Sequence, residues 1–160
     1  MNISKYSLST PVVKDVARMR DNQVTHLFQM GETDPNMAAI LPPKPQVAGQ
    51  SRRFNETQAA IMCLLAELMR FDVKAPLAAK IARRVTEGSQ RAPAVEQWSI
   101  IVTENGNVST LPYDQAELRT GYISGSRFAF ALVIDLKTYA DRIEEAVASA
   151  PQVIGADHGE

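Results

Sequence analysis

One stretch of the chain, Arg52 to Val85, predicts two successive helices joined by a short turn. Asn55 stands three residues before Gln58, which is the spacing of a helix N-cap and its capping-box partner. The apolar residues that follow recur at helical spacing on two faces, a pattern typical of a helix that is mostly buried. They are Ile61, Leu64, Leu65 and Leu68 on the first face, with Met62, Ala66 and Met69 on the second.

The second helix of this pair is predicted from its boundaries as well as from its apolar face. Asp72 tolerates the left-handed backbone of a tight turn, and Pro76 stands where the first turn of a helix accepts proline. Gly88 is a natural stop at the other end. The inner face expected between them consists of Leu77, Ala78, Ile81, Ala82 and Val85.

Upstream, the sequence predicts two shorter helices with a tight turn between them. Thr10 and Pro11 supply an N-cap and a first-turn proline for a helix that ends near Met19, and a second helix is expected over Gln23–Met30. In a DNA-binding interpretation, side chains of the second helix contact base edges. The cations that precede this helix contact phosphates. The base-reading side chains are then Gln23, Thr25 and His26, and the phosphate contacts are Lys14, Arg18 and Arg20. The alternative is an ordinary amphipathic helix pair with a solvated face.

Residues 31–50 carry four prolines and two glycines, which favours a loop leading into a β-hairpin. Ala38–Leu41 is expected as one strand and Ser51–Phe54 as the other. The cations of this hairpin are Lys44, near its tip, and Arg52 and Arg53, on the returning strand. Cations there would attract phosphate; the alternative is a solvated connector with a surface arginine pair.

Taken together, these residues resemble the winged-helix DNA-binding domain of MerR-type proteins over roughly residues 10–86. The resemblance rests on the basic pair and aromatic Arg52-Arg53-Phe54, the polar cap, the long apolar helix, the tight turn and the short amphipathic helix. It implies that a helix-turn-helix precedes the wing, that a wing arginine touches phosphate, and that the next helix pair braces the domain. The family's long C-terminal dimerisation helix has no counterpart here, so the resemblance stops near residue 90.

The C-terminal third predicts a small antiparallel sheet with one helix. A polar linker over residues 91–97 is followed by a strand from Trp98, a turn at Asn105-Gly106, and a return strand over Asn107–Leu111. Arg127–Leu136 is apolar and β-prone, as in a central strand, and a helix follows it. The thin sheet of this C-terminal third would leave one apolar face uncovered, so we expect it to pack on the first domain or on a second copy of itself. The predicted fold class is therefore α+β, with a winged helix-turn-helix domain (1–90), a linker (91–97), a dimerisation or sensing module (98–150) and a disordered tail (151–160).

The net charge differs between the N-terminal domain and the C-terminal module. Residues 1–91 hold thirteen Lys and Arg against eight Asp and Glu, a net charge of +5, whereas residues 92–160 hold four against ten, a net charge of −6. Such an asymmetry points to nucleic-acid contact on the basic side.

The sequence offers no support for catalysis, a cofactor or a metal site. No phosphate-cradling glycine loop, zinc-protease motif or nucleophile elbow occurs. Cys63 lies within an apolar run, as core filler, and His26 and His158 are too few to build a metal site. No apolar run is long enough to cross a membrane and no signal peptide is evident, so a cytoplasmic protein is expected.

These observations predict a sequence-specific regulator that binds double-stranded DNA, as a homodimer. One alternative shares the fold but bends DNA as an excision or architectural factor of a mobile element. Another is an interaction adaptor whose acidic module recruits a protein without DNA. The C-terminal module could also hold a small-molecule effector, although its aromatic residues are more simply core; they are Trp98, Tyr113, Tyr122 and Phe130.

Overall fold

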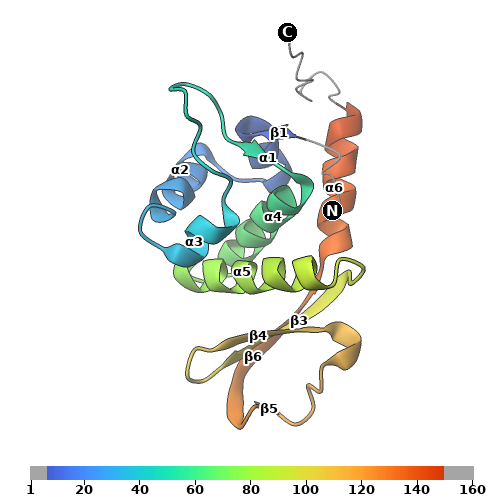
Figure 1. The fold of residues 1–160 in the computed structure, drawn as a ribbon. Coiled ribbons are helices and arrows are strands. Elements are labelled where there is room, and N and C mark those ends of the chain that lie inside the picture. Colours follow the sequence, from blue (N-terminus) through green and yellow to red (C-terminus); the bar gives the residue numbers. More distant parts are fainter. Residues whose placement is uncertain (1–6, 150–160) are drawn as a thin grey trace.

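A computed structural model describes residues 7–149 of the chain. Helices gather in the upper part of the molecule and an antiparallel sheet extends below them (Figure 1). The α-helices are α1 (Thr10–Ala17), α2 (Asp21–Met30), α3 (Pro35–Ile40), α4 (Glu56–Arg70), α5 (Ala75–Arg91) and α6 (Leu136–Ser149), with one 3₁₀ turn, η1 (Tyr113–Gln115).

The predicted helix pair is present as α4 and α5, and α4 lies at the centre of the helical part. Asn55 accepts the backbone N–H of Gln58 at 2.8 Å, and Gln58 accepts that of Asn55 at 2.9 Å, so the capping box forms as expected. Asp72 turns the chain between the helices with a left-handed φ of 62°. Both predicted apolar faces of α4 are covered, because α1, α5 and α6 all pack on this helix.

The strands form two antiparallel sheets of unequal size. The small sheet pairs Leu8–Ser9 with Arg53–Phe54, and the larger one has the strand order β4-β3-β6-β5. The fold is therefore a mixed one with antiparallel sheets, compatible with the expected α+β class. The strands are β1 (Leu8–Ser9), β2 (Arg53–Phe54), β3 (Gln97–Thr103), β4 (Val108–Pro112), β5 (Tyr122–Ile123) and β6 (Ser126–Asp135).

The expected hairpin between Ala38–Leu41 and Ser51–Phe54 is wrong. Residues 35–40 form the helix α3, because the Asp34 carboxylate accepts two backbone N–H groups of its first turn, at 2.8 and 3.2 Å. Met37 and Ile40 of α3 are buried at helical spacing. The prolines that argued against a helix all lie at its first turn or beyond its end, where they are tolerated. β2 consequently pairs with β1, far away in sequence.

Two further boundaries differ from expectation. Gly88 does not end α5, which continues to Arg91, and Ser9 rather than Thr10 is the N-cap of α1. The Thr10 hydroxyl instead donates to the carbonyl of Arg52 at 3.3 Å, joining the start of α1 to the segment before α4. The predicted tail, residues 151–160, lies outside the described residues.

The larger sheet packs on the N-terminal helices, which was one of the two partners expected for it. Trp98, Ile100 and Val102 project from β3 into the same buried cluster as the helices, and Val108 and Ile134 join them. α6 then runs back along α4 (Figure 1). The turn at Asn105-Gly106 forms as predicted, with Gly106 at a φ of 79°. The described residues thus share one continuous apolar core.

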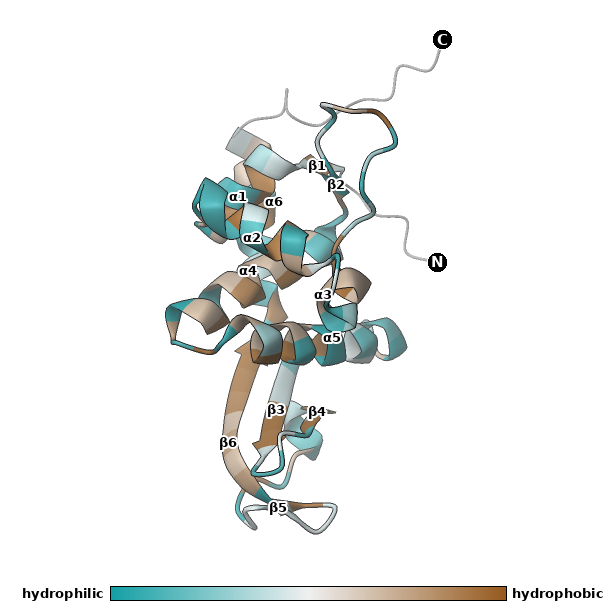
Figure 2. Cartoon of the chain, turned by 90° about the vertical axis from the view of Figure 1, so that its left-hand side faces the viewer, coloured by the Kyte–Doolittle hydropathy of each residue, from teal (hydrophilic) through white to brown (hydrophobic). Residues whose placement is uncertain are grey.

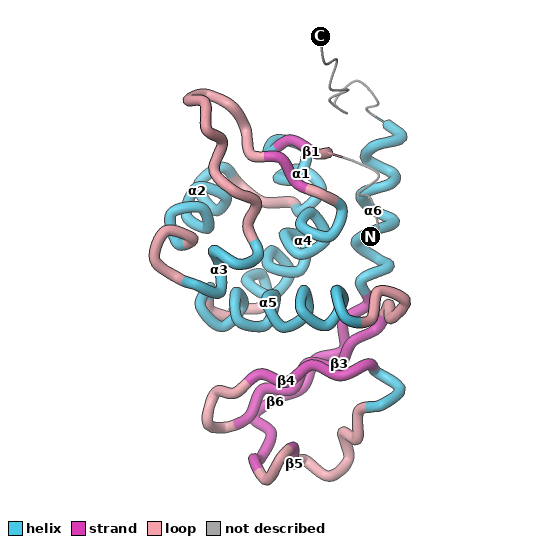
Figure 3. The backbone as a smooth tube through the Cα atoms, in the orientation of Figure 1, coloured by secondary structure: helices cyan, strands magenta, loops and turns pink. Residues whose placement is uncertain are grey.

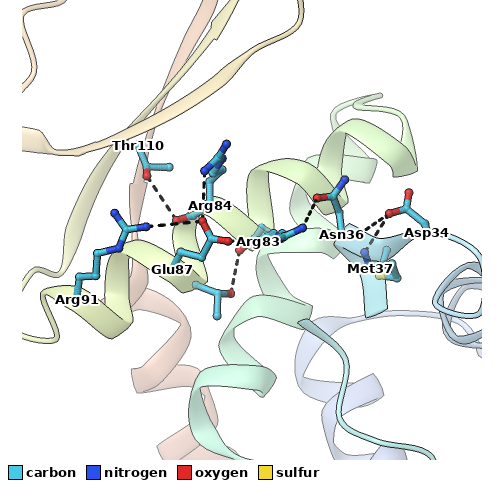
Figure 4. A network of polar contacts seen from close by, with 10 residues as sticks. Asp34, Asn36, Met37, Arg83, Arg84, Glu87, Arg91 and Thr110 are labelled. Atoms are coloured by element: carbon cyan, nitrogen blue, oxygen red, sulfur yellow. Dashed lines mark hydrogen bonds and ion pairs between the residues drawn. The ribbon is translucent and has the colours of Figure 1, made fainter. Parts of the chain in front are cut away.

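A polar network around Glu87 ties α5 to its neighbours (Figure 4). Glu87 lies 3.0 Å from Arg83 and 3.4 Å from Arg84, and Arg91 approaches it at 3.9 Å. Hydrogen bonds join these residues of α5 to other elements: Arg83 donates to Asn36 of α3 at 3.2 Å, and Thr110 of β4 donates to the Arg84 carbonyl at 3.4 Å. Several of the cations that make residues 1–91 basic are therefore engaged within the fold.

Candidate nucleic-acid interface

The helix α2 leaves one side uncovered. Val24 and Leu27 are buried, whereas a polar row along the other side is exposed (Figure 2). Helical periodicity explains this division, because residues three and four apart share a face. The exposed row consists of Asp21, Asn22, Thr25, His26 and Gln29. Thr25 and His26, two of the three predicted base-reading residues, belong to it.

Gln23, the third predicted base-reading residue, has a structural role as well. Its side-chain oxygen accepts the backbone N–H of Arg20 at 2.8 Å and so closes the first turn of α2. The side chain is half-buried. Its amide N–H₂ group is the part that remains a donor.

Lys14 is close to two carboxylates rather than standing free. Its ammonium lies 3.0 Å from Asp21 and 3.8 Å from Asp15. The hydrogen bond with Asp21 raises the pKa of Lys14 above its usual value. The pair also offsets the negative charge that Asp21 places at the start of α2. Lys14 therefore contributes less uncompensated charge than its sequence position predicts.

Arg18 and Arg20 border a pocket at the N-terminal end of α2. Arg18 ends α1 in a left-handed conformation, with a φ of 56°, and both side chains are exposed. Within residues 7–149 neither arginine forms an ion pair. The pocket measures about 280 Å³, and Arg70, from the last turn of α4, also lines it. The guanidinium groups of Arg18 and Arg20 favour an anion in this hollow, whereas Arg70 forms an ion pair with Glu67 at 3.0 Å.

Arg52 fixes the long loop 41–52 to the other end of α2. Its guanidinium carbon lies 4.3 Å above the ring of Phe28, and its Nη1 donates to the Pro42 carbonyl at 2.7 Å. The loop protrudes beyond the helices on the same side as α2 (Figure 3). Lys44 and Arg53 are exposed and, among the described residues, free of ion pairs. Arg52 is thus half-buried and braces the loop, while Arg53 and Lys44 are open to solvent.

The cations among the predicted site residues therefore fall into two groups, one at each end of α2, and the predicted base-reading residues lie on the helix between them. Arg18 and Arg20 lie at its start, and the Arg52 segment contacts Phe28 near its finish. Sequence reasoning missed Arg70, which is separated from Arg20 by 50 positions in the chain. Its only sequence signal is a basic residue in the last turn of a helix, which occurs in many helices for unrelated reasons.

The four aromatic residues considered for an effector site do not converge on one cavity. Tyr113 and Tyr122 are 49% and 56% exposed, whereas Trp98 is buried. Trp98 lines a pocket of about 490 Å³ between α5 and β4, and the other three aromatic residues do not line it. An effector pocket built from all four is therefore not formed.

Within residues 7–149 no cluster of three or more His, Cys, Asp or Glu side chains could hold a metal ion. In the same part of the chain, no helix combines the length and apolar character needed to cross a membrane. Comparison with known protein families finds no matching family model, and comparison with curated proteins finds no significant match.

Proposed function

We propose that the protein is a sequence-specific regulator of transcription that binds double-stranded DNA as a homodimer. The observation that carries this proposal is the exposed polar row of α2, bordered by uncompensated arginines. A short helix with an open polar face fits the major groove, where base edges present distinct donor and acceptor patterns.

The side chains of the row suit base recognition. Asn22 and Gln29 each offer a donor and an acceptor on one amide, which matches the paired groups of adenine. His26 can donate or accept through its ring, and Thr25 adds a hydroxyl and a methyl group. Residues of this kind discriminate between bases without supplying much of the affinity.

The cations at the two ends of α2 would hold the backbone of the duplex. Arg18 and Arg20 would take phosphates beside the first turn, with Arg70 as the third side of their pocket. Arg53 and Lys44 would reach the backbone beyond the last turn, from the loop that Arg52 fixes on Phe28. In this arrangement the loop takes the place of the expected hairpin wing, and Arg52 acts on DNA indirectly.

Salt-dependent binding tests the proposal. Purified protein is incubated with a pool of random duplexes, the bound fraction is sequenced, and the affinity for the recovered site is measured from low to physiological salt. Each phosphate contact contributes a slope of about −0.9 to log affinity against log salt, so the Arg18, Arg20, Lys44 and Arg53 contacts together predict a slope steeper than about −3.

A protein that enriches no sequence and binds duplexes no more tightly at low salt would contradict the proposal. That outcome would favour an adaptor, for which the exposed row of α2 would be a protein-binding surface. An architectural factor would instead bind with the same salt dependence but bend its site strongly, which circular-permutation gel shifts detect.

A further inference from the structure

The backbone at the end of α1 is strained at Arg18, which has a left-handed φ of 56°. The N–H of Arg18 donates to the Asp15 carbonyl at 3.1 Å, and that of Met19 donates to the Lys14 carbonyl at 2.9 Å. Glycine usually stands at the left-handed residue of such a helix end, because a Cβ is unfavourable in this conformation. Strain of this kind is kept chiefly where the side chain has a function.

The Arg18 side chain lines the pocket of about 280 Å³ beside the start of α2. Arg18 and Arg20 form no ion pair among residues 7–149. Glu67 is shared between two arginines, since it lies 3.0 Å from Arg70 and 3.8 Å from Arg142. The pocket is therefore rich in positive charge that the fold itself does not neutralise.

A count of the charged residues around the pocket gives the size of this excess. The pocket arginines and the groups in the ion pairs beside them hold five positive charges against three negative ones, a net charge of +2. The positive residues are Lys14, Arg18, Arg20, Arg70 and Arg142, and the negative ones are Asp15, Asp21 and Glu67. The excess matches a dianion.

The pocket is also larger than a bare phosphate group requires. At ~30 Å³ for each water molecule it has room for roughly nine, and a phosphate group fills about half of that space. The rest of the lining includes apolar side chains: Met19 and Ala66 are buried and Met69 is half-buried. The amide of Gln23 is a further polar group. An occupant that fills the pocket has an anionic group and a short carbon body.

We propose that this pocket binds a free phosphomonoester with a short carbon body. Its phosphate carries about −1.5 to −2 charges at pH 7, which matches the excess of the pocket. Guanidinium groups such as those of Arg18 and Arg20 can each donate two parallel hydrogen bonds to phosphate oxygens. The carbon body lies against Met19 and Met69. A phosphodiester or a carboxylate, with one charge, leaves part of the positive charge unmatched.

The bound phosphomonoester would also regulate DNA binding. Arg18 and Arg20 are the cations assigned above to phosphates of the duplex beside the first turn of α2. They cannot hold the ligand and the duplex together, so the ligand lowers the affinity for DNA. This consequence rests on the proposed function, whereas binding of the phosphomonoester does not.

A nuclear magnetic resonance titration of the intact protein without DNA tests the site. The probe is glycerol 3-phosphate at constant ionic strength, and the side-chain Nε–H signals of the arginines are followed. Those of Arg18 and Arg20 should shift and saturate, while those of Arg119 and Arg127, in the sheet part of the chain, should not. If all four signals shift alike, or none shifts, the assignment of the pocket is overturned.

Two other probes test the chemical class of the ligand. Inorganic phosphate lacks the carbon body and should bind at least about threefold more weakly than glycerol 3-phosphate. Dimethyl phosphate is a monoanion that resembles the DNA backbone, and it should bind at least about tenfold more weakly. Binding of either probe as tightly as glycerol 3-phosphate overturns the proposed ligand.

Glycine substitutions at strained positions provide a matched pair of variants. Arg18→Gly removes the guanidinium group and relieves the backbone, so the protein should fold normally but bind glycerol 3-phosphate at least about tenfold more weakly. Ser124→Gly is the control, because Ser124 also has a left-handed φ, of 47°, in the turn between β5 and β6. It should bind the probe normally. Unchanged binding by Arg18→Gly, or an equal loss in both variants, overturns the role of Arg18.

Competition with DNA is measured separately, by fluorescence anisotropy of a labelled duplex at constant ionic strength. Saturating glycerol 3-phosphate should release the duplex, and glycerol should not. A duplex that stays bound overturns the regulation. A protein that binds the probe but no DNA removes the proposed function and upholds the phosphomonoester site.

Discussion

The indole ring of Trp98 packs against the backbone of Gly88, so closely that a Cβ at residue 88 would lie 2.9 Å from two ring carbons. Trp98 begins the buried part of β3, and Gly88 lies in the last turns of α5. The indole N–H of Trp98 donates to the Val95 carbonyl at 3.2 Å, which holds the ring in place. The sheet therefore reaches the helices through a position where only glycine leaves room.

Gly88→Ala is expected to destabilise the protein although alanine is the better helix former. Overpacking a fixed ring costs about 1–3 kcal/mol, and the gain in helix propensity returns about 1 kcal/mol. The net loss in the free energy of unfolding should be about 1 kcal/mol, measured by urea denaturation. In a Trp98→Leu background the same substitution should cost less or stabilise. An equal cost in both backgrounds would show that the close contact is not its cause.

Arg18→Ala and Arg20→Ala should each weaken DNA binding and flatten its salt dependence. Removing one phosphate contact lowers the magnitude of the log-log slope by about 0.9. Arg119→Ala is the matched control, since Arg119 is an exposed cation in the loop after η1, away from α2. Fluorescence anisotropy at four or five salt concentrations gives the slopes. If the control variant changes the slope as much as Arg18→Ala does, the cations beside α2 have no special role.

Thr25→Ala and His26→Ala should alter which sequences are bound. Neither side chain carries the backbone contacts, so the salt slope should stay the same while discrimination at one or two base pairs falls by about 1–3 kcal/mol. Repeating the selection from random duplexes with each variant measures this change. Ala39→Ser, on an exposed face of α3, should keep the parental preference. An unchanged selected site for both α2 variants would remove α2 from base recognition.

Arg52→Ala and Arg53→Ala should behave differently, although the residues are neighbours. Arg52→Ala removes a ring contact and a hydrogen bond, worth about 1 kcal/mol each, and should release loop 41–52. Thermolysin would then cut faster at Val47, which is already 58% exposed. Arg53→Ala should leave cleavage and stability unchanged and weaken only DNA binding. Arg52→Lys should resemble Arg52→Ala in the cleavage assay, because lysine keeps the charge but not the planar group. Equal cleavage of all variants would refute the bracing role.

Stability should fall in alkaline solution through two groups near α4. Burial raises the pKa of Cys63 from 9.0 to about 11 and that of Tyr139 from 10.0 to about 12. Both groups hold their protons more tightly when folded, so the unfolded chain loses protons first and unfolding is favoured as pH rises. The stabilisation is intact below about pH 9 and declines up to about pH 12. Melting temperatures across this range should fall less steeply in Tyr139→Phe. A parallel decline in that variant would exclude Tyr139.

The sequence by itself determined the elements whose signals are local. The capping box of Asn55 and Gln58, the apolar spacing of α4 and the turn at Asn105-Gly106 each depend on residues within one or two turns of each other. The same holds for the exposed side of α2, since helical spacing alone separates Thr25 and His26 from Leu27. Local propensity and periodicity are read directly from the order of residues.

Only the tertiary structure decided the features that join distant residues. Arg53 pairs with Ser9 rather than with the segment before it, Gly88 receives Trp98 instead of ending its helix, and Arg70 joins Arg20 at a pocket. In each case the outcome depends on which surfaces meet once the whole core is buried. Packing and hydrogen-bond satisfaction over the complete chain outweigh the weaker local preference there, because burial of many side chains contributes more free energy than one turn or one cap.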